Sequence, residues 1–128
     1  MSIQPKYRAW YKPKGIMIEP ENLEAINFET KTIAVYKEMD GKGYNVLRMS
    51  DFELMQYTGR KDSNDKEIHH KDLWRFHGNT YMVEWDDEYA MFYFKHNGER
   101  ATDDDHIKLF VSDQGEVIGN VFQGVVQA

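Results

Sequence analysis

Apolar side chains recur at every second position in short segments of this chain, and turn-forming residues separate the segments. In residues 80–85, Tyr81, Val83 and Trp85 fall on one face of an extended chain, and Thr80, Met82 and Glu84 fall on the other. Because successive side chains of a β-strand point to opposite faces, this spacing predicts a half-buried strand. Residues 89–95 follow an acidic turn and are nearly all apolar, so the two segments predict a β-hairpin.

The same reasoning predicts strands along most of the chain. The predicted segments are residues 7–10, 16–18, 23–28, 31–36, 44–48, 52–58, 73–76, 107–111 and 116–122. Short strands with turn signals roughly every 8–12 residues are typical of all-β sandwiches and barrels. We therefore predict a mainly β fold, a compact antiparallel barrel or sandwich of short strands with at most one or two short helices.

One segment has an alternative, helical interpretation. Ser50 and Glu53 have the spacing of a helix capping box, which would start a short helix ending near Gln56. Phe52 and Leu54 also fit the period of two, which favours a strand over the same residues.

The 128 residues suffice for one ordinary domain or two very small ones. Residues 59–66 contain no apolar side chain and are either a long hairpin tip or the seam between two β subdomains. We expect a single domain over residues 1–128, with a division into residues 1–58 and 59–128 as the alternative.

Charge is uneven along the chain, whose formal net charge is −6. Residues 1–75 hold 13 Lys or Arg and 12 Asp or Glu, whereas residues 76–128 hold 3 and 10. The second part is therefore a poor surface for phosphate groups.

The first 18 residues contain no acid and interleave cations with aromatic rings. The candidate nucleic-acid-binding residues are Lys6, Arg8, Trp10, Lys12 and Lys14. Proteins that bind single strands use cations for the backbone and rings for the bases. The alternative, which we favour, is an edge strand whose outer charges prevent pairing with other chains.

Two polar clusters could hold a metal ion. His70 and Asp72 lie on one side of an extended chain, with His69 on the other, and His77 or His106 would have to complete the shell. A polar turn is the favoured interpretation. A second cluster, Asp103, Asp104, Asp105 and His106, lacks the spacing of a calcium loop and is better explained as a solvated loop.

The chain has no cysteine, which excludes disulfides, thiolate zinc sites and a cysteine nucleophile. It also lacks the glycine-rich phosphate-binding and nucleophile-elbow motifs. We therefore predict no catalytic residue, no metal and no cofactor, and expect a protein that is not an enzyme.

The amino-terminal residues lack the apolar run of a signal peptide. No segment approaches the roughly 20 apolar residues of a membrane helix. We expect a cytoplasmic protein without membrane contact.

Four segments, in this order and spacing, carry a resemblance to a known family. They are YRAW at residues 7–10, FELMQYTGRKDSNDKEIHHKDL at 52–73, YMVEWDDEYAMF at 81–92 and EVIGNVFQ at 116–123. Together they resemble the YopX family of phage and prophage proteins. The resemblance implies a β-rich fold encoded by phages or prophages of Gram-positive bacteria, with no established activity and no catalytic residue to carry over.

Residues 67–74 also resemble the segment that leads into a strand of a small SH3-like barrel, so we expect an SH3-like element in the second half.

Several residues depart from the YopX family pattern. Asp65 stands where the family has Gly, in a turn that we expect to stay left-handed. Lys71 also replaces a Gly, which argues against a left-handed turn there. Trp74 replaces a small residue, and its exposure would indicate an interface.

The sequence therefore favours a non-catalytic protein-interaction or self-associating module, with Trp10 and Trp74 as candidate interface residues. Its partners would be phage or host proteins or a second copy of the chain. The alternative is a nucleic-acid-associated accessory protein of phage replication or transcription, and the remote one a metal-dependent hydrolase.

Overall fold

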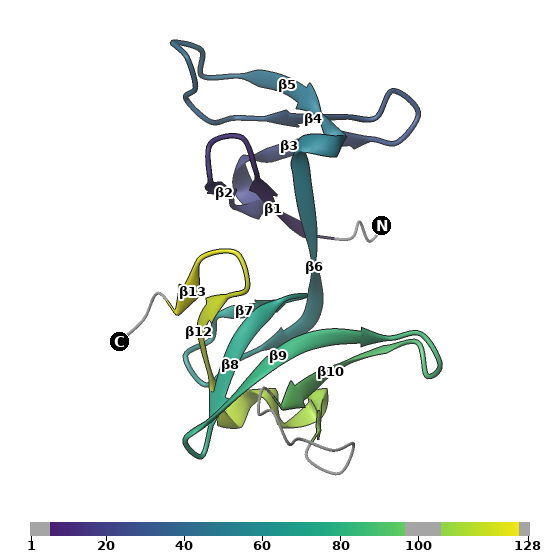
Figure 1. The fold of residues 1–128 in the computed structure, drawn as a ribbon, viewed down its shortest axis with the longest axis vertical. Helices are drawn as coiled ribbons and strands as arrows, with labels where there is room; N and C mark the ends of the chain where they lie inside the picture. The colour runs from purple at the N-terminus through teal and green to yellow at the C-terminus, as the bar shows by residue number, and fades with distance from the viewer. Residues whose placement is uncertain (1–5, 97–105, 126–128) are drawn as a thin grey trace. The chain divides into compact units, whose positions relative to one another are not determined.

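The computed structural model describes residues 6–96 and 106–125, which form antiparallel β-strands joined by turns and short 3-10 segments (Figure 1). The strands are β1 (Tyr7–Tyr11), β2 (Ile16–Ile18), β3 (Leu23–Asn27), β4 (Thr32–Val35), β5 (Asn45–Arg48), β6 (Phe52–Lys61), β7 (Glu67–His69), β8 (Asp72–Phe76), β9 (Asn79–Asp86), β10 (Met91–His96), β11 (Ile107–Lys108), β12 (Glu116–Asn120) and β13 (Gly124–Val125). The 3-10 turns are η1 (Pro20–Asn22), η2 (Met49–Asp51) and η4 (Leu109–Gln114). The prediction of a mainly β fold is confirmed.

The chain divides into two compact units, the first ending at Gln56 and the second beginning at Tyr57. In the first, β1 lies between β2 and β6, and β4 lies between β3 and β5. The inward residues of these strands form one apolar core, made of Ala9, Tyr11, Ile18, Ile33, Val35, Met39 and Phe52. The alternation in the sequence produces this core because one face of each strand is buried and the other is not.

Strand β6 continues from the first unit into the second. Its first residues pair with β1, with Phe52 opposite Tyr11, and its later residues pair with β7, with Tyr57 opposite His69. The helix suggested for residues 50–56 is wrong, because only η2 is helical there and the extended strand begins at Phe52. The boundary considered after residue 58 lies two residues from the observed division.

In the second unit, β8, β9, β10 and β11 follow one another in a curled sheet, and β12 returns to pair with β8 (Figure 1). Trp74 is fully buried there and stacks on Phe94, with ring centroids 3.8 Å apart. Its Nε1 donates to the carbonyl of Ser112 at 3.2 Å. Ser112 belongs to η4, so the strand predicted at residues 107–111 ends early, at Lys108. Burial of an indole N–H needs an acceptor, which the 3-10 turn supplies.

The turn between β7 and β8 is left-handed at Lys71, whose φ is 70°. The expectation from the missing glycine was therefore wrong at this position. The Lys71 backbone donates to Val83 O at 2.9 Å and accepts from Val121 N at 3.0 Å, and these two contacts hold the strained residue in place. Asp65 has a φ of 62°, as expected.

Asp62 is a buried carboxylate in the loop between β6 and β7. Its Oδ1 accepts the backbone N–H groups of Asn64 and Lys66, both at 2.9 Å, and its Oδ2 accepts that of Val117 at 2.7 Å. One side chain therefore shapes the loop and ties it to β12.

His70 lies beside β9 and β10 and is half-buried. Its Nε2 is 3.7 Å from Glu84 Oε2, and its ring centroid is 5.6 Å from that of Phe92. Burial is the largest influence on this imidazole and lowers its pKa; Glu84 opposes the shift and Lys71 adds to it.

We predict that Asp62→Ala lowers the free energy of unfolding by about 3 kcal/mol, because three backbone donors lose a charged acceptor. Chemical denaturation with a matched Asp87→Ala variant measures the effect. Asp87 is exposed, so its replacement should change stability by less than about 0.5 kcal/mol. Equal stabilities of the two variants would contradict the structural role of Asp62.

We also predict a pH effect that depends on His70. A lowered pKa in the folded state means that the unfolded chain takes up the proton first as pH falls. Stability should therefore fall as pH decreases below the ordinary histidine pKa of about 6.5. Denaturation at pH 7.5 and 5.5 should show a smaller loss for His70→Gln than for the wild type, and parallel losses would refute the prediction.

Candidate functional site

The basic amino-terminal residues differ in their exposure: Lys6, Lys12 and Lys14 are exposed, whereas Arg8 is buried. Arg8 is only 6% exposed, and its Nη2 lies 3.7 Å from Met55 Sδ. Lys12 Nζ lies 3.7 Å from Glu53 Oε1, and Lys14 Nζ lies 3.1 Å from Asp40 Oδ1. Lys6 is exposed. The structure therefore buries one of these cations and gives two of the lysines carboxylate partners.

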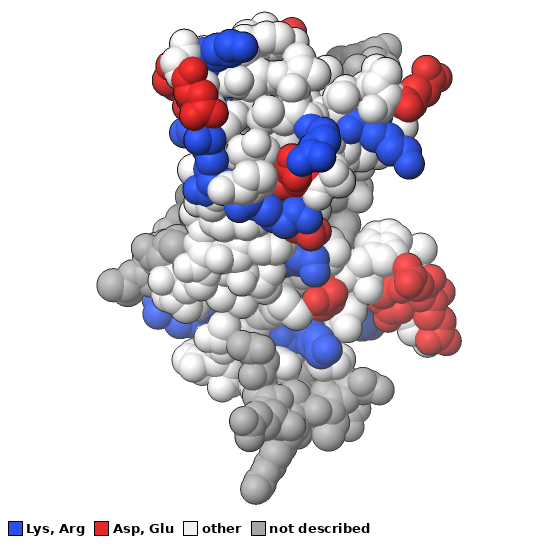
Figure 2. All heavy atoms as spheres, turned by 45° about the horizontal axis from the view of Figure 1, so that its top comes forward, with Lys and Arg blue, Asp and Glu red and all other residues white. Residues whose placement is uncertain are grey.

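The alternative explanation of an edge strand is also wrong, because β1 pairs with β2 on one side and β6 on the other. On the face that Figure 2 shows, Lys and Arg side chains lie among Asp and Glu side chains.

The two tryptophans proposed for an interface lie in different surroundings. Trp10 is half-buried in β1. Trp74 is fully buried in the core of the second unit, so the exposure on which its interface role depended is absent.

The candidate metal ligands at His69, His70 and Asp72 do not form a metal site in the structure. Asp72 is fully buried, and its Oδ2 accepts the His69 N–H at 2.8 Å, so this carboxylate shapes the turn. Within residues 6–96 and 106–125, no group of three or more His, Asp or Glu side chains could hold a metal ion. The candidate residues Asp103, Asp104 and Asp105 lie outside the described residues. His106 Nδ1 accepts the backbone N–H of His96 at 3.3 Å.

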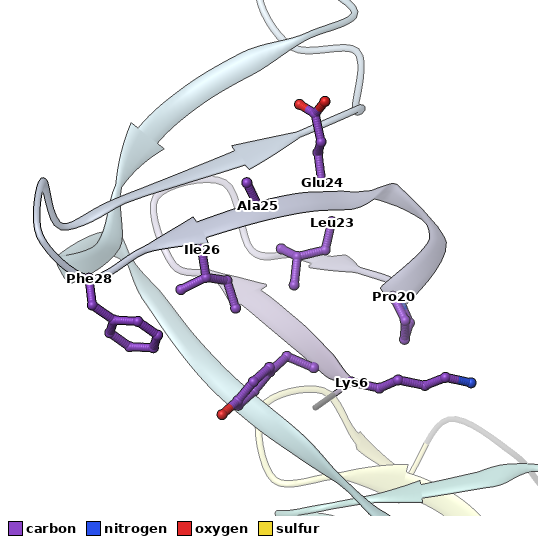
Figure 3. Close-up of a pocket in the computed structure, with 8 residues that line it drawn as sticks. Lys6, Pro20, Leu23, Glu24, Ala25, Ile26 and Phe28 are labelled. Carbon is purple, nitrogen blue, oxygen red and sulfur yellow. The ribbon is translucent and has the colours of Figure 1, made fainter. Parts of the chain in front are cut away.

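A groove of about 700 Å³ runs beside β3, an edge strand of its sheet. It is lined by Lys6, Tyr7, Pro20, Leu23, Glu24, Ala25, Ile26 and Phe28 (Figure 3). Figure 3 shows Leu23 and Ile26 on one side of β3, with Glu24 pointing to the other. Phe28, which is 65% exposed, also lines a second hollow of about 510 Å³. Neither lining brings a nucleophile to a base, so both hollows suit contact more than catalysis.

The outer surface of the sheet β3-β4-β5 carries a group of exposed large side chains that the sequence analysis did not single out. We call it the tyrosine face and define it as Tyr36, Tyr44 and Val46. Their exposed fractions are 52%, 45% and 58%. The two tyrosine rings tilt toward each other, with centroids 5.0 Å apart.

The Glu24 carboxylate lies beside the tyrosine face and binds the Tyr36 hydroxyl. The Tyr36 hydroxyl donates to Glu24 Oε1 at 3.1 Å. Hydrogen bonding to this carboxylate is the largest cause of a raised pKa in both Tyr36 and Tyr44. Both phenols therefore stay neutral, and the face presents two aromatic rings beside one negative charge.

The register explains why these side chains share a face. Ala34 pairs with Val46, and Tyr36 and Tyr44 are each two residues from one member of this pair, just beyond the ends of β4 and β5. The opposite face carries Ile33 and Leu47, which pack in the core. Period-2 alternation at residues 44–48 places Tyr44, Val46 and Arg48 together, and this was the signal in the sequence. Apolar residues on both faces of one strand indicate that the outer face can be covered by a partner.

Residues 6–96 and 106–125 contain no helix of the length and hydrophobicity that crossing a membrane requires.

Comparison with known proteins places this arrangement in a family. The crystal structure of protein EF1440 from Enterococcus faecalis has a similar fold, with a TM-score of 0.57 and 20% sequence identity, over 95% of this chain and 96% of that one. No curated protein matches the chain. The sequence pattern of the family described as YopX protein matches residues 6–125, nearly the whole length. The chain therefore belongs to the YopX protein family.

Proposed function

We propose that this YopX-family protein is a non-catalytic protein-interaction module that works through the tyrosine face. It would be a small accessory protein encoded by a phage or prophage and act in the cytoplasm of the bacterial host. Its partner would be a phage or host protein, or a second copy of the chain.

The tyrosine face is the observation that carries the proposal. Tyr36, Tyr44 and Val46 lie on and beside one sheet, and each is between 45% and 58% exposed. Tyrosine is enriched at protein interfaces because its ring buries a large area while its hydroxyl keeps a polar partner. The bond to Glu24 fixes the Tyr36 ring before a partner arrives, which reduces the entropy lost on binding.

The alternative of nucleic-acid binding has weaker support. Arg8 is buried, and Lys12 and Lys14 lie beside carboxylates, so a phosphate would compete with an existing ion pair at each lysine. The alternative of a metal-dependent hydrolase has no support among the described residues, because no three of their His, Asp or Glu side chains lie close enough to hold a metal ion.

We predict that the triple substitution Tyr36→Ser, Tyr44→Ser, Val46→Thr abolishes partner binding without unfolding the protein, because all three side chains are exposed. The measurement is twofold. Light scattering over a range of concentrations reports self-association, and quantitative recovery of proteins from the phage-carrying host reports other partners. The matched control is Tyr89→Ser, Phe110→Ser, which replaces residues 69% and 67% exposed in the second unit.

The proposal holds if the triple variant loses self-association or a specific partner that the wild type and the control variant retain. It fails if all three proteins behave alike in both measurements.

We predict further that labelled single- and double-stranded DNA and RNA show no salt-sensitive binding to the wild type. Binding that weakens steeply between 50 and 200 mM salt would contradict this expectation, because such a slope reports release of counterions from phosphates. A loss of that binding in Lys12→Gln, Lys14→Gln would locate it on the amino-terminal segment.

A further inference from the structure

Strand β5 is an edge of the sheet β3-β4-β5. Among the described residues, it pairs with β4 alone, through a regular register that runs from Val35 opposite Asn45 to Thr32 opposite Arg48. Its outer backbone groups are therefore available to another strand. The edge is visible at the β5 label in Figure 1.

The two edges of this sheet differ in how well they are protected. Strand β3 has a shift in register between Leu23 and Ala25, and it carries the Glu24 carboxylate. Irregular backbone and charge are devices that prevent edge pairing. Strand β5 has no such shift and no proline, its one charged residue is Arg48 at its end, and the exposed Val46 lies in its interior. Of the two edge strands, β5 therefore has the more regular backbone for pairing with another strand.

We infer that β5 pairs antiparallel with β5 of a second copy of this chain, with Val46 opposite Val46 and Tyr44 opposite Arg48. This inference rests on the proposed interaction function and names its partner. Two three-stranded sheets would then join into one sheet of six strands, with the tyrosine faces of both copies on the same side.

The register follows from the burial of the strand. Tyr44, Val46 and Arg48 are exposed on the outer face, whereas Leu47 packs against the core. In an antiparallel pair, residues directly opposite each other point to the same side. A slip of one residue would set an inward side chain against an outward one and is excluded on that ground.

Slips of two residues keep the faces matched but lose contacts. One such slip sets Val46 opposite Arg48, and the other leaves Arg48 beyond the paired residues. In the register that we infer, the two valines meet at the centre and each Tyr44 meets an Arg48. All four residues of β5 are then paired, with Asn45 opposite Leu47 on the inner face.

The chemistry of this register is self-complementary. Arg48 has a side chain that is 81% exposed, with Nε 3.4 Å from Asp51 Oδ2. Its guanidinium can lie on the Tyr44 ring of the second copy, where the negative face of the ring attracts a cation. The symmetry makes this contact twice, and it places no two like charges opposite each other.

The chain lacks cysteine, so one engineered thiol tests the register directly. Opposite residues in an antiparallel pair have Cα atoms about 4.5–5.5 Å apart, within the range of about 4.4–6.8 Å that a disulfide spans. We expect full-length Val46→Cys to form a disulfide-linked dimer under mild oxidation. Tyr44→Cys alone should not, because its two copies lie about 13 Å apart along the strand. The double variant Tyr44→Cys, Arg48→Cys should form the dimer again.

The matched control is Ala25→Cys, an exposed position on the β3 edge, which should stay monomeric. Efficient linkage through Ala25→Cys or Tyr44→Cys, without linkage through Val46→Cys, would overturn the inference.

Analytical ultracentrifugation of the chain without engineered thiols gives an independent result. Val46→Lys should weaken the dimer by about tenfold or more, because two like charges would meet at the centre. An unchanged dissociation constant would overturn the inference.

The two levels of the proposal fail separately. If Val46→Cys does not cross-link but the tyrosine-face variant loses a different protein partner, the second-copy inference is wrong and the interaction function stands. If neither effect occurs, both are wrong.

Discussion

Both units depend on backbone hydrogen bonds between neighbouring short strands. A strand of three to five residues cannot stand alone in water, and the chain is built almost entirely of such strands. The longest described strand, β6, pairs with β1 over its first residues and with β7 over its last, so it is a neighbour to strands of both units. In the sheet β3-β4-β5, strands β3 and β5 are the edges; β3 has a shift in register, and β5 is the edge that we propose for a partner.

Buried polar groups in the second unit accept hydrogen bonds from donors that strand pairing leaves without a partner. Asp62 satisfies three backbone donors, Asp72 satisfies one in a left-handed turn, and the Ser112 carbonyl accepts from the Trp74 indole. Each of these groups is buried, and each would be costly without its partner. Gly115 adds a steric condition, because a side chain there would collide with Trp74 and with the Arg75 carbonyl. Asp72, which the sequence analysis considered as a metal ligand, therefore stabilises a turn, and Asp62 stabilises a loop.

In the candidate site, the same period-2 alternation places some side chains in the core and others on the exposed face of the sheet. Tyr36, Tyr44 and Val46 follow the period of two as regularly as the buried residues do, yet they lie on the face without a core. Their arrangement beside Glu24 and the free edge of β5 makes contact with another protein the best-supported function. The basic residues near the amino terminus had the more suggestive sequence, but Arg8 is buried and Lys12 and Lys14 are neighbours of carboxylates.

The sequence by itself determined the mainly β fold, most strand positions and the family, because alternation and turn residues act locally and are readable in one chain. It also determined the left-handed turn at Asp65, since Asp accepts that backbone geometry at low cost. Only the tertiary structure decided that β1 is central, that Lys71 is left-handed, and that Trp74 is buried while Tyr44 is exposed. These properties depend on which segment packs against which, and contacts such as that of Trp74 with Ser112 join residues 38 positions apart. No local pattern encodes such a contact, so the surface that we propose for a partner emerged only with the folded sheets.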